Sequence, residues 1–185
     1  MATSYMGKIL RVDLGSKTSK VEDLCLDTAR KFIGGRGLGT KLYMDEVDPM
    51  IDPLSPDNKI VIITGPLTGT AVTTGCRYMV VTKSPLTGMI ACSNSGGKWG
   101  AALKYAGFDA LILEGKADKP VYMNIVEDKV EILDAANLYI PKRQTGRQRT
   151  VPALPHIHHR QFRTPGARTD GRRYRIPFAG GYCQG

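Results

Sequence analysis

Eight short runs of β-branched and apolar residues, each four to seven residues long, most constrain what this chain can fold into. Runs of this length and composition are typical of strands, because helices of globular domains need longer periodic segments. The predicted strands are Lys8–Leu14, Lys20–Leu24, Lys59–Thr64, Tyr78–Thr82, Met89–Cys92, Ala110–Glu114, Pro120–Val126 and Lys129–Leu133. Tight turns at Gly15-Ser-Lys and at Asp128-Lys129 favour antiparallel hairpins at both ends of this set. The sequence therefore predicts an α+β fold with mostly antiparallel β-sheets.

Only a few short helices are expected among these strands. Asp27 is a candidate cap for a helix through Thr28–Ile33, which Gly34-Gly35 would end. A second helix is expected to follow Gly39 and to carry Leu42, Tyr43 and Val47. The third is predicted at Lys98–Ala106, because Trp99, Leu103 and Ala106 recur at the spacing of one helix face.

The composition of the chain changes near Ile140. Residues 1–140 contain 16 Lys and Arg and 16 Asp and Glu, whereas residues 141–185 contain 10 and 1, so the net charge of +9 belongs entirely to the tail. An Arg/Pro/Gly-rich tail buries too little apolar surface to offset the entropy of ordering it. We therefore expect one folded domain over residues 1–139 and a disordered basic tail over residues 140–185.

The sequence shows no sign of a membrane protein, a secreted protein, a cysteine metal site or a catalytic pair. No stretch approaches the roughly 18 apolar residues of a membrane span, and the N-terminus lacks a signal-peptide core, so we expect a cytoplasmic protein without a membrane partner. The four cysteines form no Cys-x-x-Cys pair, and no metal cage can be inferred from them. Residues 1–140 contain no His, and no nucleophile–base pair is apparent, so no catalytic residue is assigned.

One four-residue pattern, Pro-Leu-Thr-Gly, occurs twice, in Gly65-Pro-Leu-Thr-Gly69 and in Ser84-Pro-Leu-Thr-Gly88, and each copy follows a predicted strand. Proline presets the first turn angle and glycine accepts the unusual one, so both copies are predicted to be strand-exit turns. Two interpretations stay open. The copies are either two turns with convergent chemistry, or a duplicated unit whose two loops face one ligand.

The candidate binding residues lie in glycine-rich segments that allow a backbone to approach a ligand closely. Asn94-Ser95-Gly96-Gly97 precedes the helix predicted at Lys98, and its amides could bind a phosphate or simply cap the helix. Arg77 could supply charge to the same anion or stand as a solvated arginine at a strand end. Arg36, between glycines, is a weaker candidate of the same kind. No Walker A loop or dinucleotide fingerprint accompanies them.

The order of seven motifs, rather than any single one, resembles the opening domain of the aldehyde:ferredoxin oxidoreductase family over about residues 5–139. These motifs are Gly7-Lys-Ile-Leu-Arg-Val-Asp-Leu, Phe32-Ile-Gly-Gly-Arg-Gly-Leu-Gly, Asp52-Pro-Leu-Ser-Pro-Asp-Asn-Lys, Thr64-Gly-Pro-Leu-Thr-Gly-Thr, Val81-Thr-Lys-Ser-Pro-Leu-Thr-Gly, Ser93-Asn-Ser-Gly-Gly and Ala106-Gly-Phe-Asp-Ala-Leu-Ile-Leu-Glu-Gly-Lys-Ala.

The resemblance implies an oxidoreductase that converts aldehydes to carboxylates. Its cofactor would be tungsten, or molybdenum, held by two pyranopterins whose phosphates meet at a magnesium ion, on a base with approximate two-fold symmetry. It further implies that Arg77, Asn94, Ser95, Gly96 and Gly97 contact the pterin or its phosphate, and that the Asn94 backbone carbonyl contacts magnesium. In the full-length family an iron-sulfur (4Fe-4S) cluster passes electrons to the partner ferredoxin, and a homodimer is one arrangement the resemblance allows.

The cluster-binding cysteines of that family belong to later domains and are absent here, so a truncated chain that is inactive alone is expected. We interpret residues 140–185 as a frameshifted or foreign C-terminus, because out-of-frame translation of a GC-rich gene yields Arg, Pro, Gly and His. The rival is a genuine basic tail. In that case the chain would be a non-catalytic binding or adaptor protein that docks on nucleic acid or an acidic partner.

Overall fold

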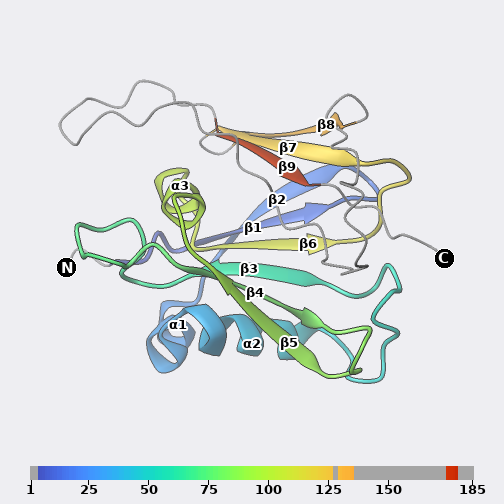
Figure 1. The fold of residues 1–185 in the computed structure, drawn as a ribbon, viewed down its shortest axis with the longest axis horizontal. Helices are drawn as coiled ribbons and strands as arrows, with labels where there is room; N and C mark the ends of the chain where they lie inside the picture. Colours follow the sequence, from blue (N-terminus) through green and yellow to red (C-terminus); the bar gives the residue numbers. More distant parts are fainter. Residues whose placement is uncertain (1–3, 127–128, 136–173, 179–185) are drawn as a thin grey trace, which may run out of the picture. The chain divides into compact units, whose positions relative to one another are not determined.

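The fold is described here from a computed structural model of the chain, which describes residues 4–126, 129–135 and 174–178 (Figure 1). The chain divides into two compact units, Met1–Lys116 and Ala117–Gly185, and each is described by itself. No helix in the described residues is long and apolar enough to cross a membrane.

The first unit is a six-stranded sheet with helices on both of its faces. Its strands are β1 (Lys8–Asp13), β2 (Thr18–Asp23), β3 (Ile60–Thr64), β4 (Tyr78–Lys83), β5 (Ile90–Ser95) and β6 (Ala110–Glu114). The order across the sheet is β2-β1-β6-β3-β4-β5. Every neighbouring pair is antiparallel except β1 and β6, which run parallel. The predicted α+β fold with mostly antiparallel strands is therefore confirmed.

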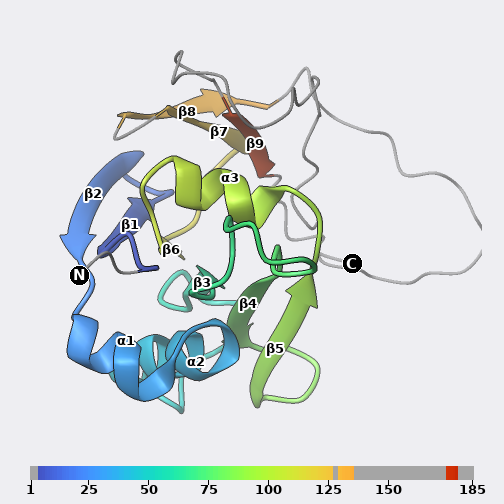
Figure 2. The ribbon, with the colours of Figure 1, turned by 90° about the vertical axis from the view of Figure 1, so that its left-hand side faces the viewer.

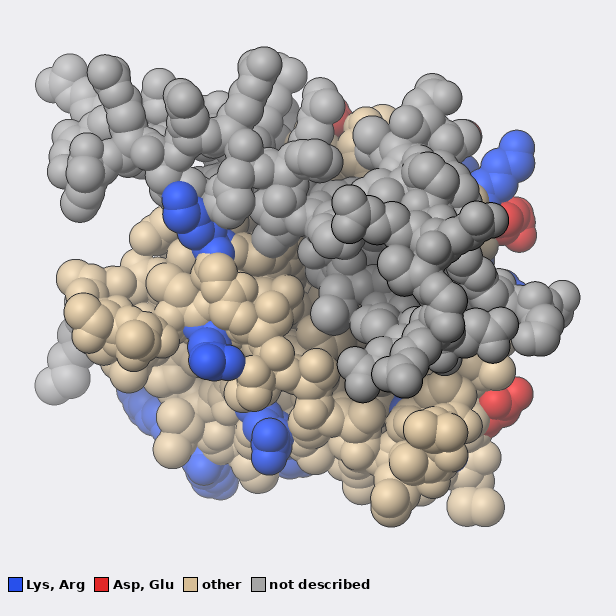
Figure 3. All heavy atoms as spheres, in the orientation of Figure 1, with Lys and Arg blue, Asp and Glu red and all other residues tan. Residues whose placement is uncertain are grey.

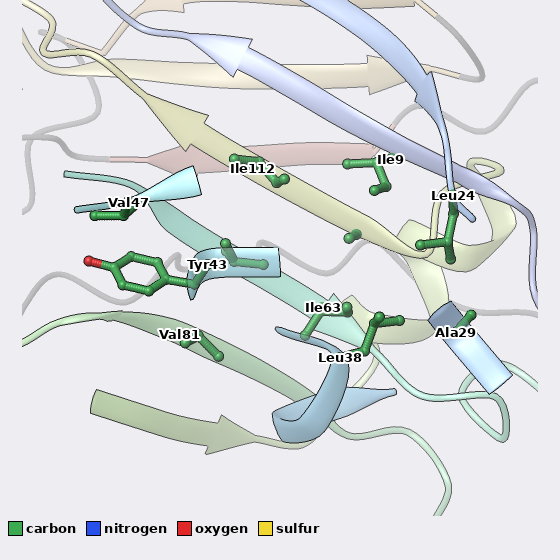
Figure 4. Packing of buried hydrophobic residues seen from close by; sticks show 11 residues of the cluster. Ile9, Leu24, Ala29, Leu38, Tyr43, Val47, Ile63, Val81 and Ile112 are labelled. Atoms are coloured by element: carbon green, nitrogen blue, oxygen red, sulfur yellow. The ribbon is translucent and has the colours of Figure 1, made fainter. Parts of the chain in front are cut away.

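The three helices of this unit are α1 (Leu26–Phe32), α2 (Gly35–Glu46) and α3 (Trp99–Tyr105). Figures 1 and 2 show α1 and α2 on one face of the sheet and α3 on the other. The core beneath α2 joins Leu38 and Tyr43 to Ile63, Val81 and Ile112 of the sheet, all at most 3% exposed (Figure 4). The central strands β3 and β6 are apolar along most of their length because side chains on both of their faces are buried.

The predicted helix boundaries between residues 25 and 40 need correction. Cys25, not Asp27, occupies the N-cap of α1, without a side-chain capping bond, and Asp27 lies in the first turn. Ile33, with φ of 65°, ends this helix, and α2 begins at Gly35 rather than after Gly39. Gly34-Gly35 is predicted to end the first helix and Gly39 to precede the second, but Gly39 lies inside α2 against the sheet. A Cβ there would lie 2.8 Å from Ile63 Cγ2, so glycine is needed for close packing.

The duplicated turns do not face one ligand. β3 and β4 pair antiparallel, with Thr64 opposite Tyr78, so turns that follow each strand leave the sheet at opposite ends. The expectation that both loops face one ligand is therefore wrong, and the approximate two-fold symmetry of the fold stays a prediction.

Arg11 on β1 is the centre of a network of ion pairs at the surface of the sheet. Its guanidinium contacts Glu22 of β2 at 3.0 Å, Glu46 of α2 at 2.8 Å and Glu114 of β6 at 3.1 Å. Lys59 adds contacts to Glu46 at 2.8 Å and to Glu114 at 3.2 Å. The network joins the last turn of α2 to three strands.

The second unit is a three-stranded antiparallel sheet of order β8-β7-β9, made of β7 (Val121–Val126), β8 (Lys129–Asp134) and β9 (Tyr174–Phe178). The predicted hairpin of β7 and β8 is confirmed, although part of its turn lies outside the described residues. Strand β9 corrects the expectation of disorder for residues 174–178, since they pair with β7. The rest of the tail, residues 140–173 and 179–185, lies outside the described residues.

Candidate functional site

The predicted binding residues gather at one end of the six-stranded sheet. β3 ends there, β4 begins there and β5 ends there, because Thr64 pairs with Tyr78 and Tyr78 pairs with Ser95. The segments next to these strand ends are Gly65 onward, Arg77, and Gly96-Gly97. Residues far apart in the sequence are thus neighbours at this edge.

Arg77 and Asn94 form a direct contact across β4 and β5. The Arg77 side chain is exposed, and its Nη1 donates a hydrogen bond of 2.8 Å to Oδ1 of Asn94. Asn94 lies in β5 opposite Met79, and Arg77 directly precedes β4, so the two side chains start from neighbouring segments. A guanidinium carries five N–H donors, and one bond to an amide oxygen leaves others for an anion.

Gly96 and Gly97 follow β5 and precede α3, and a Cβ added to either would meet no atom within 4 Å. Gly97 has φ of +86°, which favours glycine, whereas Gly96 lies outside the left-handed region. The backbone conformation therefore explains Gly97 but not Gly96. Open space over a glycine that its own φ does not require fits a ligand lying against the chain.

The helix-capping explanation of this segment is wrong. The N-cap of α3 is Lys98, without a side-chain capping bond, and Asn94 and Ser95 belong to strand β5. Helix α3 has seven residues, too short for its dipole to add much to an anion site. The candidate site therefore rests on Arg77, Asn94 and the glycine backbone.

Trp99 lies directly behind this segment. The side chain is 2% exposed, and its Nε1 has no hydrogen-bond partner among the described residues. Its ring packs against Tyr78 with centroids 4.6 Å apart. An unpaired buried N–H is uncommon in folded proteins.

Arg36 lies in the first turn of α2 at the same end of the sheet, and its side chain is exposed. The neighbouring Gly34 approaches the strand exit closely, because a Cβ on it would lie 3.0 Å from Gly65 Cα and 3.1 Å from Pro66 Cδ. The structure thus brings Arg36 to the correct edge, but no described hydrogen bond joins it to Arg77 or Asn94.

Thr68 is a residue of this edge that the sequence did not single out as functional. It is 4% exposed, and its Oγ1 accepts a hydrogen bond from Gly65 N at 3.2 Å and donates one of 3.0 Å to the Arg77 carbonyl. The sequence distinguishes Thr68 from Thr87, the threonine of the second copy, only by the residue that precedes each Pro-Leu-Thr-Gly motif. That copy begins with Ser84, whose own Oγ accepts the turn amides, whereas the first begins with Gly65 and has no such acceptor.

A side-chain metal cage is not seen in the part of the chain that the structure describes. No group of three or more His, Cys, Asp or Glu residues there could hold a metal ion. Cys25, Cys76 and Cys92 are free thiols. Thr28 and backbone groups hydrogen-bond to the Cys25 sulfur and lower the pKa of this exposed thiol, but it stands alone.

An arginine–asparagine pair beside open glycine backbone at one sheet end has the chemistry to hold an anion or an anionic cofactor. The comparison with protein families makes this specific. Residues 9–150 match the family model described as "Aldehyde ferredoxin oxidoreductase, N-terminal domain", and the chain belongs to this family.

Relatives of known name agree with this assignment. The tungsten-containing aldehyde ferredoxin oxidoreductase of Pyrococcus horikoshii is 56% identical over 135 residues, 73% of this chain and 22% of that protein. The enzyme of the same name from Pyrococcus furiosus is 53% identical over 133 residues, 72% of this chain and 22% of that protein. An aliphatic sulfonate oxidoreductase, WOR-like subunit, of P. furiosus is 41% identical over 139 residues, covering 74% of this chain and 22% of that subunit.

A solved structure shares the fold. The active-site complex of benzoyl coenzyme A reductase with 1,5-dienoyl coenzyme A matches 75% of this chain and 21% of that one, with a TM-score of 0.72 and 38% identity. The chain thus spans only about a fifth of the length of the relatives that it matches.

Proposed function

We propose that this chain is the pterin-binding domain of a tungsten-dependent aldehyde oxidoreductase. The observation that carries the proposal is the 2.8 Å contact of Arg77 with Asn94 beside the open backbone of Gly96 and Gly97. When bound, a tungsten (or molybdenum) bis-pyranopterin supplies the redox centre that oxidises an aldehyde to a carboxylate. The residues of this chain bind and orient that group, and none of them is assigned a catalytic role.

Each predicted site residue has a role in this proposal. Arg77 donates charge-assisted hydrogen bonds to a pterin phosphate, because its guanidinium matches the geometry of phosphate oxygens. The amides of Gly96 and Gly97 lie open to the same phosphate, and Ser95 ends the strand that presents them. Asn94 orients Arg77 through Oδ1 and offers its backbone carbonyl to magnesium. Arg36 faces the same edge as a second cation.

The rest of the enzyme lies beyond this domain. We propose that an iron-sulfur cluster and ferredoxin receive the electrons in a full-length enzyme, since the cysteine spacing of this chain offers no cluster site. The chain alone is then inactive. Homodimerisation, cytoplasmic location and the interpretation of the tail stay predictions. The adaptor alternative depends on the tail, most of which lies outside the described residues.

Two variants test the site through cofactor content. Arg77→Ala removes a charge-assisted donor and should lower retention by about 1.5–3 kcal/mol, roughly 10-fold to 150-fold in affinity. Gly96→Val should also lower it, because a β-branched side chain fills the open space above the backbone. Thr87→Val, in the turn at the opposite end of the sheet, is the matched control.

The measurement is tungsten and pterin per mole of protein after expression of the full chain with tungstate, with circular dichroism to confirm folding. Loss of cofactor in both site variants, with the control unchanged, would support the proposal. Full cofactor content in folded Arg77→Ala and Gly96→Val would mean that these residues belong to an ordinary strand end.

A further inference from the structure

The two Pro-Leu-Thr-Gly turns share a sequence but not an environment. Thr68 is buried at 4% exposure, whereas Thr87 is exposed. Both turns end on a glycine in the left-handed region, Gly69 with φ of +80° and Gly88 with φ of +67°. The turn conformation therefore requires neither threonine to be buried, and the burial of Thr68 needs another reason.

The hydroxyl of Thr68 forms hydrogen bonds to two different segments, one as a donor and one as an acceptor. It accepts from the Gly65 amide at the end of β3 and donates to the Arg77 carbonyl at the start of β4. Its methyl carbon Cγ2 lies 3.2 Å from where a Cβ of Gly100 would be, in the first turn of α3. Thr68 therefore joins the residue after β3 to the residue before β4, and its methyl group lies close to the first turn of α3.

Thr87 makes no comparable connection. Its Oγ1 accepts a hydrogen bond of 3.3 Å from the Met89 amide two residues later, within its own turn. The amides of Leu86 and Thr87 are bonded to Ser84 instead. The same four-residue motif thus serves as a local turn at one end of the sheet and as a link between segments at the other.

The hydrogen bond from Thr68 holds the backbone of Arg77, which would otherwise follow an exposed loop without a tertiary contact of this kind. Residues 70–74 are exposed, and Arg77 itself is exposed while contacting Asn94 through one guanidinium nitrogen. A fixed backbone lets a long side chain keep one geometry at a lower entropic cost. We infer that Thr68 is a positioning residue that fixes the Arg77 backbone, so that its guanidinium meets Asn94 and an anion beside Gly96. This inference deepens the proposed function and rests on it.

Three variants of the full chain separate this role from simple packing. Thr68→Val keeps the shape and removes the hydroxyl, Thr68→Ser keeps the hydroxyl and removes the methyl, and Thr87→Val is the control. The first readout needs no ligand, namely the NMR resonances of the Arg77 guanidinium and the Asn94 side-chain amide. Thr68→Val should displace both, while Thr68→Ser and Thr87→Val should leave them at their wild-type positions.

The second readout is a titration with inorganic pyrophosphate, followed by the fluorescence of Trp99. This is the single tryptophan of the chain and packs against Tyr78, the residue that follows Arg77. Thr68→Val should raise the apparent Kd about fivefold to tenfold, the usual effect of one hydrogen bond, and Thr68→Ser should bind like the wild type.

The outcomes distinguish the two proposals. Wild-type resonances of Arg77 and Asn94 in folded Thr68→Val would overturn the positioning role, whatever the titration shows. A wild-type chain that binds no pyrophosphate, or an Arg77→Ala chain that binds it equally well, would overturn the anion site instead. If Thr68→Val does not fold, displaced Arg77 resonances in a folded Thr68→Ser would count against the role, and undisturbed ones would support it.

Discussion

Gly39 is the residue at which α2 comes closest to the sheet. A Cβ there would lie 2.8 Å from Ile63 Cγ2 and 3.0 Å from Val81 Cγ2, both in a core that is fully packed. Gly39→Ala gains helix propensity but must push α2 away from β3 and β4. Overpacking of this kind typically costs about 1–3 kcal/mol.

Urea unfolding of the full chain measures this cost. Met44→Ala, at a side chain on the same helix that is 49% exposed, is the control and should change the free energy of unfolding by less than about 0.5 kcal/mol. A Gly39→Ala chain as stable as the wild type would show that the helix-to-sheet distance is not limited by this residue.

At the same scale, the pairing of Arg77 with Asn94 could be anticipated only in part. The sequence placed both in segments beside strand ends, and the family resemblance joined them at one ligand. Their contact depends on the register of β4 and β5, which no local pattern gives. Thr68 was missed because its motif is identical in both copies, and only tertiary packing makes one of them buried.

Among the elements, α2 is tied to the sheet at its C-terminal end by the Arg11 network. The hydrogen bond from Arg11 is the largest cause that lowers the pKa of Glu46 to about 2, against the opposing effect of burial. The same guanidinium lowers the pKa of Glu22. A carboxylate with a lowered pKa contributes stability that is fully present above its unfolded pKa and is lost as the pH falls through its folded pKa.

Replacing Arg11 with Met should therefore destabilise the chain most near neutral pH. The expected loss at pH 7 is about 1–2 kcal/mol, since these side chains remain partly exposed and are screened. The difference between wild type and variant should shrink as the pH falls from about 5 to about 2, where the carboxylates of the native state become protonated. Free energies of unfolding at pH 7, 4 and 2.5 measure it. A difference independent of pH would mean that Arg11 acts through packing alone.

Some of the strands and helices could be predicted from local sequence patterns alone, and others could not. The strands of residues 1–135 were predicted within a few residues, because short β-branched runs between turns are a local signal. The start of α2 was missed because glycine breaks isolated helices, yet here close packing selects it. Strand β9 was missed because its pairing with β7 spans about fifty residues, and its Arg- and Pro-containing sequence carries no strand pattern.

At the scale of the whole molecule, the tail carries the net charge of +9, whereas the charge balance of residues 1–140 favours a small anionic ligand over a polyanion. Residues 1–140 have no net charge, and on the face in Figure 3 the Lys and Arg side chains stand apart with uncharged surface between them. A nucleic-acid surface would need a continuous basic patch. The face in Figure 3 shows no such continuous patch among the described residues.

We propose that a pterin phosphate binds at one end of the sheet, where it contacts Arg77, Asn94, Gly96 and Gly97. The most direct measurement is an NMR titration of the full chain with a pyranopterin phosphate, following backbone amides and the Arg77 side chain. We expect saturable shifts at Arg77, Gly96 and Gly97, and none at Gly88, the glycine of the matched turn at the opposite end. Equal shifts at Gly88, or no shift at Gly96 and Gly97, would contradict it.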